Sequence, residues 1–83
     1  MGLDTVEFLH YAEKEFDIKI TDAEAGNVTT MSEFTKLCQQ KLSFSIDEEQ
    51  VFTRLTAILH QHFVDASLEI KREHAIVKDI GLN

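Results

Sequence analysis

The sequence predicts an all-α domain built as a small bundle of three long helices and one short helix. The chain has 83 residues, which is enough for one domain with a modest core. It contains no proline and only three glycines, a composition that favours helices. Apolar residues recur at helical spacing in three separate segments, and signals for helix starts precede several of them.

The first helix is expected from about Leu3 to Phe16. Its apolar stripe recurs every three or four residues and consists of Leu3, Val6, Leu9, Ala12 and Phe16. Asp4 and Glu7 lie in its first turns and suit the positive end of the helix dipole. A short extended connection at residues 17–21 should follow.

The next two helices are predicted from their start signals. Asp22 is a good N-cap for a short helix at residues 23–26. Thr30 and Glu33 have the spacing of a capping box, in which each side chain satisfies a free backbone N–H of the other residue. The helix that follows should end near Leu42. Its expected buried face consists of Met31, Phe34, Leu37 and Cys38.

A linker at residues 43–45 should lead into the last long helix. Ser45 and Glu48 have the spacing of a second capping box, and the helix should continue to about Phe63. Its inner face is expected to contain Val51, Phe52, Leu55, Ile58, Leu59 and Phe63.

Residues 64–83 show weaker periodicity and predict a long loop. Scattered apolar residues should attach this loop to the bundle, namely Leu68, Ile70, Ile76, Val77 and Ile80. An ordered loop of roughly twenty residues is unusual in a compact domain and is usually functional.

Two segments resemble the two halves of an acyl carrier protein, in exchanged order. Residues 3–42 resemble its second to fourth helices, beginning with Leu-Asp-Thr-Val-Glu. Residues 46–83 resemble its first helix and the long loop that follows, and their end, Ile-Val-Lys-Asp-Ile-Gly-Leu-Asn, is similar to the family's Phe-Val-Glu-Asp-Leu-Gly-Ala-Asp. The resemblance implies a circularly permuted acyl carrier protein fold in one domain, residues 1–83. It also implies that Asn83 lies beside Gly2. Most contacts in a helical bundle are local, so moving the chain ends changes its contact order little.

The resemblance places Gly2 where the family carries its phosphopantetheine serine. In that family 4′-phosphopantetheine is attached to the serine hydroxyl, and its thiol carries acyl groups as thioesters. Glycine has no hydroxyl, so no prosthetic group is expected on this chain as it stands. The other serines lack the family's sequence context; they are Ser32, Ser43, Ser45 and Ser67. We therefore expect an acyl-carrier-like scaffold of fatty acid or polyketide-type biosynthesis that is not loaded. No nucleophile paired with a base is visible, so the chain is not expected to be an enzyme.

The resemblance also implies a surface for protein partners. Asp4, Glu7 and Glu13 match acidic positions that meet basic patches on synthases and transferases of the family. Lys14 and Gly26 stand where the family usually has acids, which should weaken such docking. The alternative is that these acids form an ordinary solvated helix face.

A further set of residues matches positions that line an acyl chamber in the family. These are Val6, Leu9, Phe16, Ile20, Ala25, Val28 and Ile76. Ordinary core packing is the alternative explanation for them. His10 falls where a methionine often lies at the mouth of that chamber, which makes the expected entrance more polar.

Composition argues against several other classes. The net charge of −7 disfavours nucleic acid as a partner. No segment has the length and hydropathy of a membrane span, and Asp4 and Glu7 argue against a signal peptide, so a cytoplasmic location is expected. One cysteine fits a reducing compartment. No zinc-ligand spacing occurs among His10, His60, His62, His74 and Cys38. Weak divalent-cation binding at residues 47–49 is the more plausible metal interaction.

Three alternatives remain open at this stage. The chain is a working carrier if its serine is supplied elsewhere, for example after Asn83 in a longer parent. It is a binding module without acyl chemistry if only the acidic helix functions. We expect a monomer, but the short linker also permits an intertwined dimer in which residues 46–83 pack on a second copy.

Overall fold

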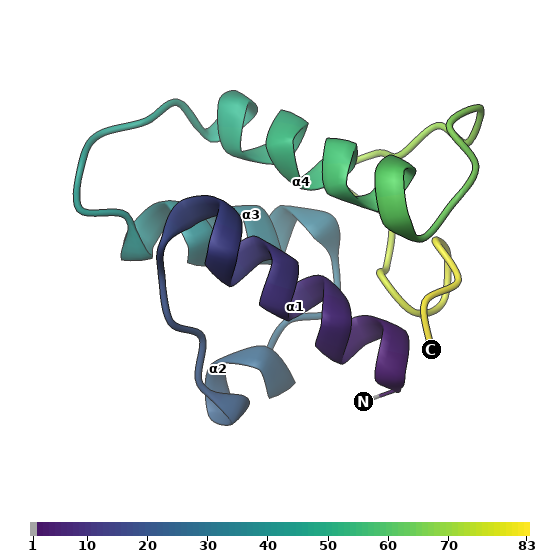
Figure 1. Ribbon diagram of the computed structural model, residues 1–83, viewed down its shortest axis with the longest axis horizontal. Coiled ribbons are helices and arrows are strands. Elements are labelled where there is room, and N and C mark those ends of the chain that lie inside the picture. The colour runs from purple at the N-terminus through teal and green to yellow at the C-terminus, as the bar shows by residue number, and fades with distance from the viewer. Residues whose placement is uncertain (1) are drawn as a thin grey trace.

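The computed structural model describes residues 2–83 and contains four α-helices (Figure 1). Their bounds are α1 Leu3–Phe16, α2 Asp22–Gly26, α3 Met31–Lys41 and α4 Glu48–His62. Within the described residues no β-strand occurs, and the one isolated β-bridge joins Thr30 to Ala75. The prediction of an all-helical domain with three long helices and one short helix is confirmed.

The helices surround one core, and α4 packs on both α3 and α1. In Figure 1, α4 lies across the top, α1 crosses in front of α3, and α2 lies below them. The chain from residue 63 to residue 83 then returns along one end of the bundle towards the start of α1 (Figure 1). The structure measures 31 × 25 × 21 Å along its principal axes.

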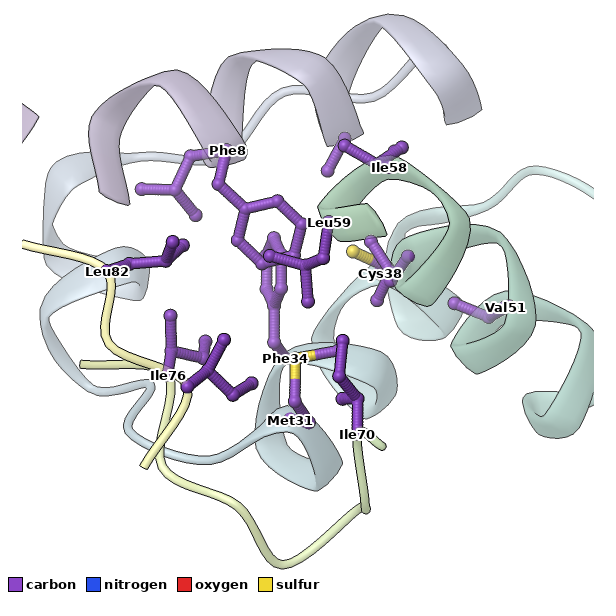
Figure 2. Packing of buried hydrophobic residues seen from close by; sticks show 14 of the residues in the cluster. Phe8, Met31, Phe34, Cys38, Val51, Ile58, Leu59, Ile70, Ile76 and Leu82 are labelled. Carbon is purple, nitrogen blue, oxygen red and sulfur yellow. The ribbon is translucent and has the colours of Figure 1, made fainter. Parts of the chain in front are cut away.

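Aromatic rings from three parts of the chain meet at the centre of the core. The rings of Phe8 and Phe34 make an edge-to-face contact with centroids 5.2 Å apart, and Phe63 approaches Phe8 at 6.1 Å. Figure 2 shows Phe8 pointing towards Phe34, with Leu59 beside them. The largest fully buried side chains are Phe8, Phe34, Met31, Leu55, Leu59, Val51, Thr35 and Cys38. Edge-to-face pairs of this kind stabilise a core beyond the area they bury.

The buried face of α1 differs from the predicted stripe. Phe8 is fully buried although the sequence pattern did not include it, whereas the side chain of Leu3 is 73% exposed. The face that meets the core consists of Thr5, Phe8, Leu9, Ala12 and Phe16. This set also has helical spacing, but it is centred on the large ring of Phe8. Leu3 lies in the first turn of α1, outside this buried face.

The helix starts agree with the sequence only in part. The predicted box at α3 is confirmed: Thr30 Oγ1 accepts from Glu33 N, and Glu33 Oε1 accepts from Thr30 N. The backbone N–H groups of Thr30 and Thr29 both donate to the Glu33 carboxyl, and they lower its pKa below the usual value.

The start signals of α2 and α4 were misassigned by one or two residues. The cap of α2 is Thr21, which forms a capping box with Glu24, and Asp22 is the first helical residue. The cap of α4 is Asp47, whose side chain accepts from Glu49 N, so Ser45 does not cap this helix. In both places two residues close together in sequence have suitable side chains, and the backbone conformation decides which of them caps.

Residues 64–83 form a long segment with little regular structure that packs on the bundle. Ile70, Ile76, Ile80 and Leu82 are buried in it. Leu68 and Val77 were expected to anchor the segment, but they are 39% and 55% exposed.

This segment also completes the start of α3. Its carbonyls accept from two first-turn N–H groups of the helix, Met31 N to His74 O at 3.0 Å and Ser32 N to Arg72 O at 2.8 Å. The guanidinium of Arg72 lies 4.9 Å from the centroid of the Phe52 ring, which links the segment to α4. The first N–H groups of a helix have no partner within it, so these contacts hold the segment in place and satisfy the helix.

Thr30 caps a helix and Ser45 does not, and this difference should appear in the stability of the two alanine variants. We expect Thr30→Ala to lower the free energy of unfolding by about 1 kcal/mol, because it removes a cap. Ser45→Ala should leave it unchanged, since this hydroxyl caps nothing. Urea-induced unfolding followed by circular dichroism measures both variants. Equal losses in the two variants would contradict the assignment of the caps.

Candidate functional site

The last described residues lie directly against the start of α1. The carbonyl oxygen of Asn83 accepts from Thr5 N at 2.9 Å and from Thr5 Oγ1 at 2.8 Å. Gly81, with φ +95°, turns the chain into this position in a conformation that suits glycine. Asn83 therefore lies beside Gly2, as the sequence predicts.

Gly2 is the N-cap residue of α1, and it makes no side-chain cap. A Cβ atom built on Gly2 would overlap the backbone carbonyl group of Asn83. Any side chain at residue 2 therefore requires Asn83 to move. The close approach of the two backbones explains why glycine fits here.

An apolar cavity of about 220 Å³ lies next to this junction. Its lining comes from α1, from the end of α2 with the two residues before Thr30, and from the final segment. The lining residues are Thr5, Phe8, Leu9, Ala25, Val28, Thr29, Ala75, Ile76, Val77 and Lys78. Figure 2 shows Ile76 and Leu82 from the final segment on the same side of Phe8.

Four of the seven residues expected in an acyl chamber line this cavity, namely Leu9, Ala25, Val28 and Ile76. The other three, Val6, Phe16 and Ile20, are not part of its lining. Phe16 is buried in the core, and Val6 and Ile20 are half-buried.

His10 does not lie at the mouth of the cavity. It is exposed and lines a shallow surface depression with Glu7, Tyr11 and Lys14. The sequence analysis missed the other cavity residues, which are Thr5, Phe8, Thr29, Ala75, Val77 and Lys78.

The three acids expected to meet partners have different surroundings. Glu7 is exposed and Asp4 is half-buried, one turn apart on α1. Glu13 is half-buried, and its Oε2 accepts from Ile20 N at 2.8 Å. The carboxylate of Glu13 therefore holds the connection between α1 and α2 and is less available to a partner than that of Glu7.

The histidines take up separate places in the structure. His62 stacks on Tyr11 with ring centroids 4.1 Å apart, His60 Nε2 lies 2.7 Å from Leu68 O, and His74 Nδ1 accepts from Lys71 N. Among residues 2–83, no three histidine, cysteine or acidic side chains gather as a metal site would require. No helix in this part of the chain has the length and hydropathy needed to cross a bilayer.

Cys38 is the one cysteine, and it is fully buried on α3. Burial raises the pKa of the Cys38 thiol to about 12, a shift that the charge of Lys41 opposes. The thiolate is the reactive form of cysteine, so this side chain is a core residue with low reactivity in the folded chain.

The two hydrogen bonds to Asn83 predict a role for the Thr5 hydroxyl in stability. Thr5→Val keeps the shape of the side chain and the backbone bond but removes the hydroxyl donor. We expect the free energy of unfolding in urea to fall by about 1 kcal/mol. The matched control is Thr53→Val, because the Thr53 hydroxyl is exposed and bonds only to Glu49 O of its own helix. A loss of the same size in the control would contradict a specific role for the Thr5–Asn83 contact.

Burial of Cys38 predicts slow alkylation of the folded chain. At pH 8 we expect a maleimide to react roughly a hundredfold more slowly than with the same chain unfolded in urea, because reaction requires local opening. Intact mass against time measures both rates. Similar rates in buffer and in urea would show that Cys38 is accessible.

Comparisons of this chain with protein-family models, with curated proteins and with solved structures find no match. The structure contributes two features of the site to the functional interpretation. One is the contact of Asn83 with the start of α1, and the other is the apolar cavity beside it.

Proposed function

We propose that this chain is a circularly permuted member of the acyl carrier protein family that has lost its loading residue. Its role would be that of a carrier-like scaffold in fatty acid or polyketide-type biosynthesis. The proposal depends on the sequence resemblance of residues 3–42 and 46–83 to the two halves of that family.

The observation that carries the proposal is the contact between Asn83 and Thr5. In an α-helix each N–H bonds to the carbonyl four residues earlier. The acceptor of Thr5 N is instead the carbonyl of Asn83, 78 positions later in the sequence. The final segment thus meets α1 as a preceding segment would in a continuous chain. This is the arrangement expected if the two halves of an ancestral fold exchanged order.

The cavity gives a second, weaker support. Its lining combines six residues between Thr5 and Thr29 with residues 75–78, so both of the segments that resemble the family contribute to it. A carrier of acyl groups needs an apolar space of this kind for its cargo. Leu9 and Ile76, which are far apart in sequence, both line this cavity.

The acidic surface of α1 suits binding to basic partners, and we expect this binding to be weak. Asp4 and Glu7 lie one turn apart, and the whole chain carries a net charge of −7. Lys14 in the last turn of α1 and the engaged carboxylate of Glu13 reduce the acidic surface. We expect encounter with a synthase or transferase of the family to be slower than for a fully acidic helix.

Loading at residue 2 requires a hydroxyl, which glycine does not have. We therefore expect no change in intact mass when the chain is incubated with coenzyme A and a broad-specificity phosphopantetheinyl transferase. Gly2→Ser should gain the mass of one phosphopantetheine group, because it places a hydroxyl before Leu3-Asp4-Thr5. Mass spectrometry of the intact chain measures both.

The matched control is Gly2→Ala. It introduces the same Cβ against Asn83 and therefore the same displacement, but no hydroxyl. Circular dichroism shows whether each variant is folded. A mass gain in the unchanged chain would place the loading site at another serine. A folded Gly2→Ser variant that stays unmodified would contradict the proposed relationship at α1.

A further inference from the structure

We propose that a second copy of this chain is a binding partner. Two copies exchange residues 48–83 and form an intertwined dimer, in which α4 and the final segment of each chain pack on α1, α2 and α3 of the other. Each copy then supplies residues 75–78 and Asn83 to the cavity and junction of its partner. This inference does not depend on the proposed function, because it uses only the contacts between the two parts of one chain.

The two parts, residues 2–41 and residues 48–83, are covalently joined only through the α3–α4 connection at residues 42–47. In Figure 1 this connection forms an arc at one end of the bundle, away from the core. Ser43, Phe44 and Ser45 at its centre are exposed. The side chain of Gln39 donates to Ile46 O at 2.9 Å near its far end. Few contacts therefore hold the connection in its closed path.

The backbone of the connection does not require a closed turn. Leu42 has φ −72° and ψ 140°, and Asp47 has φ −66° and ψ 134°, so both ends are extended. The connection contains neither glycine nor proline, the residues that most often fix a tight reversal. Among residues 2–83, positive φ occurs only at Asp17 and Gly81. The connection is therefore free to straighten without leaving a conformation that only a special residue adopts.

The surface offered to a second copy is one that the chain already binds within itself. Phe63, just after α4, packs its ring against Phe8 and Tyr11 of α1, with centroids 6.1 and 5.8 Å apart. Backbone hydrogen bonds also cross between the two parts, namely Thr5 N to Asn83 O, Ile76 N to Thr29 O, Met31 N to His74 O and Ser32 N to Arg72 O. An exchanged dimer keeps all of these contacts and forms them between copies, which is why exchange is a low-cost route to a dimer.

Phe44 supplies a contact that only the dimer makes. Its side chain is 60% exposed at the centre of the connection. In a dimer of two identical copies, the two connections pass each other near the two-fold axis. The two Phe44 rings then shield each other from water, whereas in the closed monomer they face solvent. Burial of this apolar surface favours the exchanged form.

Protein concentration decides between the two forms. A short connection holds the two parts together at an effective concentration on the order of millimolar. We therefore expect the closed monomer at micromolar concentration and the dimer near millimolar concentration. Exchange requires the core to separate, because Phe8 and Phe63 belong to different parts and pack together. It should be slow in buffer and faster in mild denaturant.

The first test is light scattering after size-exclusion chromatography. The whole chain is incubated at about 1 mM in urea near its unfolding midpoint, and the urea is then removed. We expect a monomer peak and a dimer peak, with the dimer persisting after dilution in buffer. A sample that contains only monomer after this treatment would overturn the proposal.

A crosslink distinguishes exchange from side-by-side association. Glu15 on α1 and Arg54 on α4 form a partly exposed ion pair, with Arg54 Nη1 3.4 Å from Glu15 Oε2. In the double variant Glu15→Cys, Arg54→Cys, a short bis-maleimide joins the two positions. On a denaturing gel, crosslinked dimer should run at twice the chain mass and crosslinked monomer at the chain mass. A crosslinked dimer peak that runs at the chain mass would overturn exchange. The single variant Glu15→Cys is the control for links through other groups, since Cys38 is buried.

The role of Phe44 is tested by its effect on dimerisation alone. Phe44→Ser should weaken dimer association about tenfold, the scale of burying a large apolar side chain, and leave the urea midpoint of the monomer unchanged. Leu3→Ser is the matched control, because Leu3 is 73% exposed and lies at the start of α1, at the opposite end of the bundle (Figure 1). Equal dimerisation of the two variants would contradict the assignment of Phe44. None of these measurements uses a transferase or residue 2, so this inference and the proposed function fail by different results.

Discussion

The fold depends on how the N-terminal N–H groups of two long helices are satisfied. Each helix begins with backbone donors that have no partner inside the helix. In α3, two of them bond to the carbonyls of His74 and Arg72, and in α1 the N–H of Thr5 bonds to Asn83. All three acceptors lie in the irregular segment after α4. Ordering such a long segment costs conformational entropy, and these bonds, with the burial of Ile70, Ile76, Ile80 and Leu82, offset that cost.

The helices could be predicted from the sequence because periodicity and capping motifs involve residues close together in the chain. The bounds of α1 follow from helical periodicity, and the start of α3 follows from the Thr30–Glu33 box, whose two partners are three residues apart. The caps of α2 and α4 were harder to assign. Thr21 stands beside Asp22, and Ser45 lies near Asp47, so local chemistry allows two choices in each place. The structure takes Thr21 and Asp47, whose extended backbone points the side chain at the first turn.

The candidate site was less accessible, since it depends on which faces meet in three dimensions. Helical spacing fits both the predicted stripe of α1 and the observed face around Phe8. The observed face is buried because the Phe8 ring packs on Phe34 and Phe63. Residues 75–78 carry no periodic pattern, so nothing local assigned Lys78 to a cavity wall. The contact of Asn83 with α1, by contrast, was predictable, because two separate resemblances implied it from opposite ends of the chain.

The junction and the cavity share residues, and this links their stabilities. Thr5 lines the cavity and also donates two hydrogen bonds to Asn83. The residues from Ile76 to Lys78 form another wall and belong to the same segment that ends at Asn83. Hydrogen bonds worth about 1 kcal/mol each, together with the burial of Ile76, Ile80 and Leu82, hold this segment to α1. Separation of the junction would therefore also open the cavity. By linkage, any ligand that binds only the closed cavity stabilises the contact between Asn83 and Thr5.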